Sequence, residues 1–384
     1  MYATHMVFWI GSITGFVISG FMADRVGRKK TLLTFIALGG IGNSLGAFFS
    51  GFVGFTVLRF VTGLGATTVS GAAFVLSIEF TTSHRRSLIT LIFGITWGFL
   101  GGALPWFGYL VQSWRIMLLS GGVGDLVLYS ACLTETDVTG KKASNGEKSP
   151  NFLQTTLLVA KSPRIRRLTL AIYFTGFIIG LCYNVMLLQL GRLNLNIYWA
   201  YTLAAFSGFP MTAACVPLMD TIGRRWTIMG FLLITAGTCL PLGLLRLESN
   251  ALTLSLAVVS IMAVAGAYLT TNQMALEVFP TVIRGRAVLL QKLLGEAGCL
   301  VGTQVASLAE SNTYTPVLVM GVLAAVTAVV ALLLPETLEQ ELPQTIEDGE
   351  NFGKDQGLWF CPFSMARRAR RDRCVSLDRC LIID

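Results

Sequence analysis

The fold of this chain is decided by a short charged stretch, Gly20-Phe21-Met22-Ala23-Asp24-Arg25-Val26-Gly27-Arg28-Lys29. Before it, residues 3–22 carry no charged side chain beyond His5. A helix of about 20 apolar residues is long enough to cross the hydrocarbon core of a bilayer. The sequence therefore predicts a membrane-spanning helix that ends in a charged loop at the membrane surface.

Three charged motifs recur in the same order at a nearly constant offset. The separation is 196 residues from Asp24 to Asp220, 198 from Glu79 to Glu277 and 201 from Glu135 to Glu336. Both members of each pair follow an apolar run on the same predicted face of the membrane. This spacing predicts a parallel internal repeat about an axis normal to the membrane.

Apolar residues form long runs throughout the chain. Hydrophobic residues make up 53% of the sequence and charged residues 13%, whereas about a quarter of a soluble domain is charged. Several runs of this kind exclude a single signal peptide as their explanation. We expect eleven spans, at about residues 3–22, 31–50, 53–78, 87–108, 115–133, 168–190, 197–219, 227–245, 251–275, 287–308 and 315–334.

The loops between these runs alternate in charge. Basic loops mark the cytoplasmic side of a membrane protein, so the basic set predicts an outer Met1 and a cytoplasmic C-terminus. The net charge of +8 then reflects the basic loops on the cytoplasmic side, and we expect no nucleic-acid partner. We expect four parts: an N-terminal transmembrane bundle at 1–133, a cytoplasmic linker at 134–167, a C-terminal transmembrane bundle at 168–335 and a cytoplasmic tail at 336–384.

Several of these motifs resemble those of a known family. The stretch 20–29 resembles the most characteristic motif of the major facilitator superfamily. Residues 277–284 resemble the Glu–Pro–Thr–Arg motif of its organic cation and anion transporters among the solute carriers. Residues 334–348 resemble their closing segment, and 162–166 the start of their seventh helix. The likeness runs from about residue 3 to residue 350.

This resemblance implies an all-α major facilitator fold with two pseudo-symmetric helical bundles. The family has twelve spans, and this chain begins at what looks like the second, so we expect about 11 of the 12 transmembrane helices. The family members are multi-pass carriers of small organic ions in the plasma membrane. They perform no covalent chemistry, so the resemblance implies no catalytic residue, no enzyme activity, no cofactor and no metal.

Charged residues at the cytoplasmic loops are candidates for a gate. A carboxylate near the start of a helix is favoured by the helix dipole, and the arginines can pair with acidic residues of neighbouring helices. Such ion pairs would hold the cytoplasmic face of the protein closed while the external face is open. The alternative is plain topology signalling. The residues concerned are Asp24, Arg25, Arg28 and Glu79 in the first half, and Asp220, Arg224, Arg225, Glu277 and Arg284 in the second.

Glu296 is the main candidate for substrate binding. It lies near the middle of the tenth predicted span, where a charge costs roughly 2.5–3.5 kcal/mol on insertion scales. The resembling cation carriers have an acidic residue at this place and the anion carriers a basic one, which favours a cationic or zwitterionic substrate. The alternatives are an intrahelical pair with Lys292, which would have the weaker residue order, and a protonated structural carboxyl.

Three further residues are weaker substrate candidates. Phe177 and Tyr183 match positions at which the family uses aromatic residues, and an aromatic face attracts a protonated or quaternary amine. Gln273 is an amide within a predicted span. Ordinary helix packing is the alternative for the aromatic residues, and a structural hydrogen bond is the alternative for the amide.

The sequence thus predicts facilitated or ion-coupled transport of a small organic cation or zwitterion by alternating access. The expected partners are this substrate, a coupling ion that the sequence does not identify, and membrane lipid. Anionic lipid could contact the basic segment 366–373, although a solvated tail is the alternative. Two rival functions are a receptor-like or orphan member that binds without transporting, and an inactive truncated product.

Overall fold

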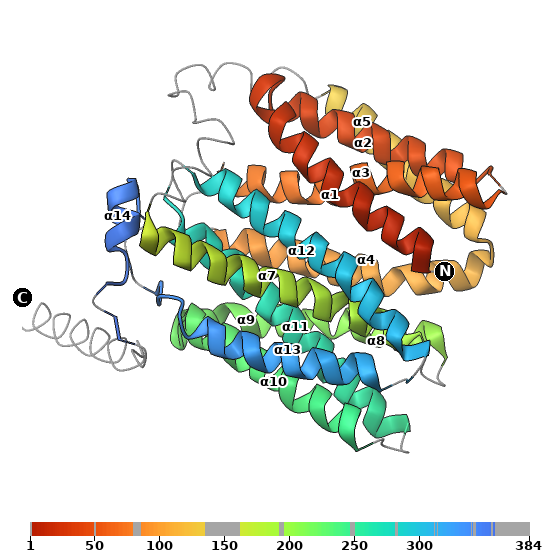
Figure 1. The fold of residues 1–384 in the computed structure, drawn as a ribbon. Helices are drawn as coiled ribbons and strands as arrows, with labels where there is room; N and C mark the ends of the chain where they lie inside the picture. Colours follow the sequence, from red (N-terminus) through yellow and green to blue (C-terminus); the bar gives the residue numbers. More distant parts are fainter. Residues whose placement is uncertain are drawn as a thin grey trace, which may run out of the picture.

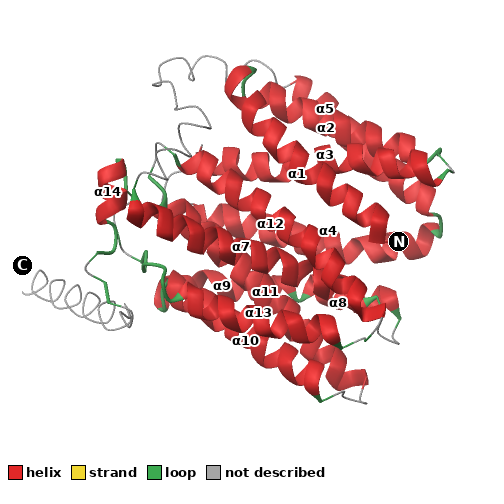
Figure 2. Ribbon diagram, in the orientation of Figure 1, coloured by secondary structure: helices red, strands yellow, loops and turns green. Residues whose placement is uncertain are grey.

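The computed structural model is a bundle of long helices (Figures 1 and 2). Within the described residues the regular structure is entirely helical. Most of the predicted linker and all of the basic segment 366–373 lie outside them. The described residues are 2–49, 51–79, 86–134, 162–191, 196–245, 250–280, 283–310, 312, 314–338, 340, 343–354 and 356–357.

The first half contributes five helices. They are α1 (Tyr2–Arg25), α2 (Arg28–Gly46), α3 (Phe52–Glu79), α4 (Arg86–Val111) and α5 (Trp114–Thr134). The second half contributes α7 (Pro163–Leu190), α8 (Ile197–Phe206), α9 (Gly208–Thr221), α10 (Arg224–Leu244), α11 (Asn250–Val278), α12 (Arg284–Ser307), a 3-10 turn (Leu308–Glu310), α13 (Thr315–Ala331) and α14 (Ile346–Asn351). Each of the eleven predicted spans coincides with helix, and their ends differ from the prediction by several residues.

One predicted span is not a single helix. The run 197–219 divides into α8 and α9 at Ser207. Pro210 explains the break, because it has no N–H to donate to the carbonyl of Phe206 and its ring clashes with that carbonyl. The predicted span itself is confirmed, since the α8–α9 pair is together long and apolar enough to cross a membrane. The break within it was not predicted, because the apolar pattern continues unchanged through the proline.

Seven segments of the described chain are long and apolar enough to cross a membrane. They are α1, the first part of α3, α5, α7, the α8–α9 pair, α10 and α11. The helix α13 is apolar but shorter. Because helices satisfy their own backbone hydrogen bonds, they are one of the two structures that can span a bilayer.

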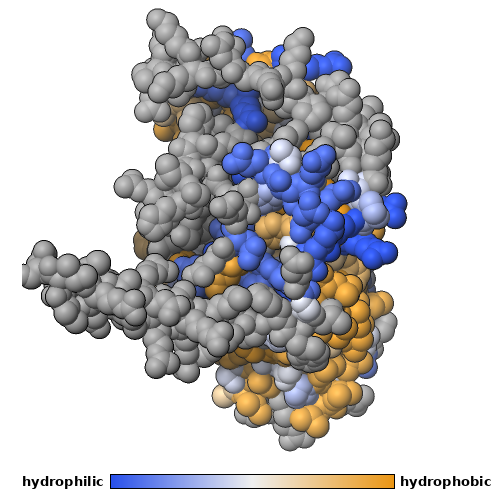
Figure 3. Space-filling model, turned by 90° about the vertical axis from the view of Figure 1, so that its left-hand side faces the viewer, coloured by the Kyte–Doolittle hydropathy of each residue, from blue (hydrophilic) through white to orange (hydrophobic). Residues whose placement is uncertain are grey.

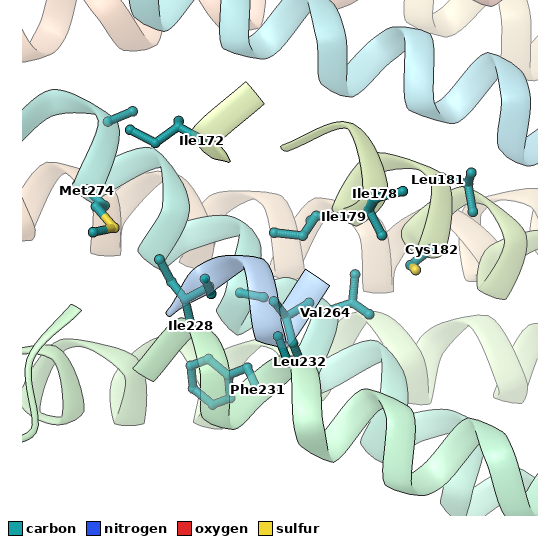
Figure 4. Close-up of a cluster of buried hydrophobic side chains, with 14 of the residues drawn as sticks. Ile172, Ile178, Ile179, Leu181, Cys182, Ile228, Phe231, Leu232, Val264 and Met274 are labelled. Carbon is teal, nitrogen blue, oxygen red and sulfur yellow. The ribbon is translucent and has the colours of Figure 1, made fainter. Parts of the chain in front are cut away.

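The second half packs around α7. This helix contacts α11, α12 and α13, and α10 packs in turn against α11 and α13. Figure 4 shows side chains from α7, α10 and α11 meeting in this core, among them Ile179, Ile228 and Val264. Gly180 allows the backbones of α7 and α12 to touch, because a Cβ there would collide with the carbonyl of Gly295. Small residues of this kind are the usual means of close helix contact within a membrane.

The two halves meet through α1, α3 and α4 of the first half and α8, α9, α11 and α12 of the second. In the first half α3 packs against α1 and α2, and α2 packs against α5. Contacts between the halves run from α1 to α12 and from α4 to α8 and α9. Figure 1 shows α12 and α4 between the upper group of helices (α1, α2, α3, α5) and the lower group (α7, α10, α11, α13). Residues on the facing sides of these helices are therefore placed where the halves adjoin.

Candidate functional site

The acidic candidate Glu296 lies midway along α12, at the contact between the halves. Its polar neighbours are Ser12 of α1 and Lys292 of its own helix. The atom Oε2 is buried and has no hydrogen-bond partner among the described residues. Burying a polar atom without a hydrogen bond is costly, so this carboxylate oxygen is an unusual feature of the interface.

Lys292 points toward α11. Its Nζ donates a hydrogen bond to the Tyr268 hydroxyl at 3.1 Å and lies 5.2 Å from the centre of the Tyr268 ring. The side chain passes α3, where its Cδ lies 3.6 Å from the place a Cβ at Gly71 would take. The ammonium is therefore held between helices of both halves, by a hydrogen bond and a cation–π contact.

Tyr183 links α7 to the first half. Its hydroxyl accepts a hydrogen bond from Trp97 Nε1 of α4 at 3.4 Å. Phe177, two turns earlier on α7, is partly buried and packs against the core. Trp97 and Tyr268 keep 68% and 44% of their surface exposed, so a large part of each side chain is not covered by other side chains.

We refer to Ser12, Trp97, Tyr183, Tyr268, Lys292 and Glu296 as the central cluster. Its members come from five helices of the two halves, and in α1 Ser12 hydrogen-bonds to Thr67 of α3. It combines one carboxyl, one ammonium and three aromatic rings, a set suited to binding a small charged molecule without covalent chemistry. Sequence reasoning missed Tyr268 and Ser12, because a tyrosine or serine in an apolar run carries no functional signal by itself.

A second cluster lies where α10 begins and α11 ends. The Arg224 Nε lies 3.1 Å from Glu277 Oε2, and its Nη2 donates to Glu277 Oε1 at 3.3 Å. The two side chains are 14% and 12% exposed, so the pair is largely shielded from solvent. Arg224 also reaches Asp220 at 3.3 Å, although Asp220 itself is exposed.

Two residues near this ion pair bind the same carboxylate. Gln273 Nε2 donates to Glu277 Oε1 at 2.9 Å, and Thr337 Oγ1 donates to Glu277 Oε2 at 2.5 Å. The structure therefore places Gln273 beside a predicted gating residue, one helical turn away on α11. Thr337 was not among the sequence candidates, although its motif was recognised as part of the repeat.

Glu336 closes the start of α10. Its carboxylate accepts backbone N–H groups of Arg224 at 2.8 Å and Arg225 at 3.2 Å, which would otherwise be the unsatisfied donors of a helix N-terminus. Burial raises the pKa of the Glu336 carboxyl above its ordinary value, against the opposing effect of the backbone N–H groups. Gly223 has φ +99°, and any Cβ there would collide with this carboxylate. Glycine thus fits both the backbone and the contact.

The remaining candidates of the second half lie around this region. Arg225 is buried, and its guanidinium donates to the carbonyls of Leu332 at 2.5 Å and Gly357 at 3.4 Å. Arg284 begins α12 and donates from Nε to the Phe279 carbonyl at 3.1 Å. We refer to Asp220, Arg224, Gln273, Glu277, Glu336 and Thr337 as the charged cluster. Figure 3 looks onto the end of the molecule where α14 lies, and hydrophilic residues gather in the middle of that face.

The first half repeats the backbone of this region. Gly27 precedes α2 with φ +97°, as Gly223 precedes α10 with φ +99°. This agreement supports the internal repeat read from the sequence, because both glycines adopt a conformation that other residues rarely tolerate. Arg25 and Arg28 are exposed. The side chains of Asp24 and Glu79 lie outside the described part of the chain, so their predicted pairing stays a prediction.

Fold and clusters together define a class of protein: a multi-pass helical membrane protein built from two related halves, with charged and aromatic residues where the halves meet. Comparison with known proteins gives the family. Residues 3–303 match the family described as Major Facilitator Superfamily. The chain belongs to this superfamily, whose members are transporters.

Curated relatives place the chain near the carriers of organic ions. It is 23% identical to organic cation transporter 1 of Caenorhabditis elegans, over 95% of this chain and 69% of the relative. It is 25% identical to human organic anion transporter 3, over 90% of this chain and 71% of the relative. The chain is therefore similar both to a carrier named for organic cations and to one named for organic anions. These names do not decide the charge of its substrate.

Solved structures agree with this fold. A proton:xylose symporter of the superfamily, bound to 6-bromo-6-deoxy-D-glucose, superposes with a TM-score of 0.68 at 17% identity, covering 90% of this chain and 87% of the symporter. At this identity the likeness supports the fold and leaves the substrate open.

Proposed function

We propose that this chain is a secondary carrier of small organic ions, specifically cations or zwitterions, that works by alternating access. In this proposal residues 1–133 and 168–335 are the two bundles that move against each other, and 134–167 links them. The chain lies in the plasma membrane, with the charged cluster and the tail 336–384 on the cytoplasmic side. The coupling ion, if one is used, is left open.

The observation that carries the proposal is the position of Glu296. It lies between helices of the two halves, and its Oε2 has no hydrogen-bond partner among the described residues. A cationic substrate would supply a partner for this oxygen and a counter-charge in addition to that of Lys292. The aromatic rings of Tyr183 and Trp97 lie at the same interface, and Phe177 lies on the same helix as Tyr183, so the substrate amine would have π faces as well as a carboxylate.

The charged cluster would hold the helices of the second half together while the two halves move against each other. The pair of Arg224 and Glu277 ties the start of α10 to the end of α11, and Thr337 adds the segment after α13. We propose that these residues keep the second half rigid at this end. Asp24, Arg25, Arg28 and Glu79 would do the same in the first half, and Arg284 and Arg225 would fix the adjoining helix starts.

The test is uptake of labelled choline by the purified full chain in proteoliposomes, compared with empty vesicles. We expect Glu296→Gln to reduce choline uptake about tenfold or more, because a charge-assisted contact is worth roughly 1.5–3 kcal/mol. Glu310→Gln, an exposed carboxylate in the 3-10 turn, is the matched control and should leave uptake unchanged.

Binding separates the role of Glu296 from a general defect. The neutral isostere 3,3-dimethylbutanol, which replaces the nitrogen of choline by carbon, should compete equally well in wild type and Glu296→Gln. If Glu296→Gln weakens the binding of both compounds by the same factor, Glu296 does not distinguish a charged ligand from a neutral one. Choline that binds without uptake in wild-type vesicles would favour the receptor-like alternative.

A further inference from the structure

We propose that Lys292 binds an anionic group of the substrate, so that the central cluster selects a zwitterion whose cationic group lies at Glu296. This assignment rests on the proposed transport function and narrows it. The anionic group would be a carboxylate or a similarly small anion. Lys292 then becomes a specificity-determining residue, and Tyr268 a residue that positions it.

Contacts with two other helices hold the Lys292 side chain in place. A lysine in a membrane helix commonly extends its flexible stem toward the surface. Here the stem instead runs past Gly71 of α3, and Nζ is bound by the Tyr268 hydroxyl at 3.1 Å over the ring of the same residue. The ammonium is therefore held where helices of both halves adjoin, at the level of the proposed substrate.

Glu296 follows Lys292 by one helical turn, about 6 Å along the axis. Residues four apart share a helix face, so the two charges present themselves to the same side. The Lys292 hydrogen bond described above goes to Tyr268, while Oε2 of Glu296 has no hydrogen-bond partner among the described residues. A molecule with a cationic and an anionic group a few ångströms apart would complement both side chains at once.

A simpler reading is that Lys292 only neutralises Glu296. Two observations disfavour it. The lysine precedes the glutamate, which is the weaker order for such a pair in a helix. The hydrogen-bond geometry also directs Nζ onto Tyr268 of another helix. The two readings predict opposite effects of removing the lysine charge, so they can be separated by binding measurements.

The experiment uses three small molecules of one shape and the purified full chain in detergent. Glycine betaine carries both charges, choline carries the cation alone, and 3,3-dimethylbutanoate carries the anion alone. In wild type we expect betaine to bind roughly tenfold more tightly than choline, which corresponds to one charge-assisted contact. Lys292→Met should remove this tenfold advantage without weakening choline. Lys354→Met, an exposed lysine of the tail, is the control.

Tyr268→Phe gives a second, milder variant, since it keeps the ring and removes only the hydroxyl that binds Nζ. This variant should weaken the binding of betaine about threefold and leave the binding of choline unchanged, because a neutral hydrogen bond is worth about 1 kcal/mol or less. Glu296→Gln should weaken betaine and choline alike and leave 3,3-dimethylbutanoate unaffected.

Three outcomes would overturn the assignment. Wild type could bind choline as tightly as betaine or bind neither, or Lys292→Met could weaken both ligands equally. Tighter betaine and choline binding in Lys292→Met would point to neutralisation of Glu296 instead. If wild type binds neither ligand, choline uptake fails as well and both proposals fall. In the other cases the transport proposal stands, since it depends on choline uptake and on Glu296→Gln.

Discussion

The two halves of the molecule carry the same charged motif on differently packed helices. In the second half, 67% of the apolar stretch of α7 is buried, with 50% for α10 and 44% for α11. In the first half the figures are 28% for α1, 22% for α3 and 6% for α5. In the second half α7 packs against α11, α12 and α13, whereas in the first half α5 packs mainly against α2.

This comparison shows that a repeated sequence does not guarantee a repeated environment. Both halves present a glycine with positive φ followed by two basic residues. In the second half that turn is closed by Glu336 and tied to Glu277. We therefore expect equivalent substitutions to cost more in the second half, and the following variants test this, beginning with the largest expected effect.

The closest packing of the second half should tolerate substitution least. Gly180→Val inserts a branched side chain against the Gly295 carbonyl, and we expect a loss of about 3 kcal/mol in stability. Gly124→Val in α5 is the counterpart, because nothing lies within 4 Å of a Cβ at that position. Thermal unfolding in detergent measures both. Equal losses in the two variants would contradict the contrast between the halves.

Removing the Glu336 carboxyl should have the next largest effect. Glu336→Ala removes the acceptor of two backbone N–H groups at the start of α10 and leaves these donors unpaired, so we expect a loss of about 2 kcal/mol. Hydrogen exchange of the first turn of α10 would report the change locally. If exchange there is unchanged, the cap contributes nothing to this helix.

The same carboxyl should give the protein a characteristic pH dependence. Burial raises its pKa in the folded state, so the folded protein binds this proton more tightly than the unfolded chain. Its contribution is therefore fully present below the unfolded pKa and declines as pH rises toward the folded pKa. Wild type minus Glu336→Gln stability, measured upward from about pH 4.5, should fall. A rising difference would mean that the backbone N–H groups outweigh burial.

The repeat itself is tested by a matched pair of gate variants. We expect Glu277→Gln to slow choline uptake several-fold while binding changes little, because the ion pair with Arg224 is lost and one of the two accepting oxygens becomes an NH2 donor, at a distance from the central cluster. Glu79→Gln is the counterpart in the first half and should act in the same direction. Uptake that is normal in both variants would leave only the topological reading of these charges.

The smallest effect is expected in the tail. Thr345 and Asp348 form a capping box at the start of α14, and Thr345→Ala should cost this short helix about 1 kcal/mol. The pKa of Asp348 is lowered by the backbone N–H and the hydroxyl of Thr345. The cap should therefore weaken as pH falls, opposite in sign to Glu336. Choline uptake should be unaffected, since α14 packs near the start of α7 and away from the central cluster.

The membrane spans could be predicted from sequence because they depend on local composition. A run of about 20 apolar residues must become a helix in a bilayer, whatever its neighbours are. Hydropathy does not predict the break of the run 197–219 at Ser207, because it does not register the missing N–H of Pro210. The repeat was also visible, because identical turns need identical residues at Gly27 and Gly223.

The residues of the site could be named individually but not assembled. Glu296 was noticed because a charge within lipid is expensive, and Glu277 because its motif recurs in the chain. That Gln273 contacts Glu277, and that Tyr268 holds Lys292, depends on which helix faces meet. Such faces are set by close approaches such as that at Gly180, over separations that a local pattern does not encode.

By itself the sequence determined the eleven apolar runs, the internal repeat and the resemblance to the superfamily, because hydropathy and turn chemistry act over a few residues. Only the tertiary structure decided that Glu336 closes α10 from beyond α13, and that a carboxyl and an ammonium of α12 adjoin aromatic rings of both halves. The physical reason is that these contacts join elements far apart in the chain, and their geometry follows from how the helices pack.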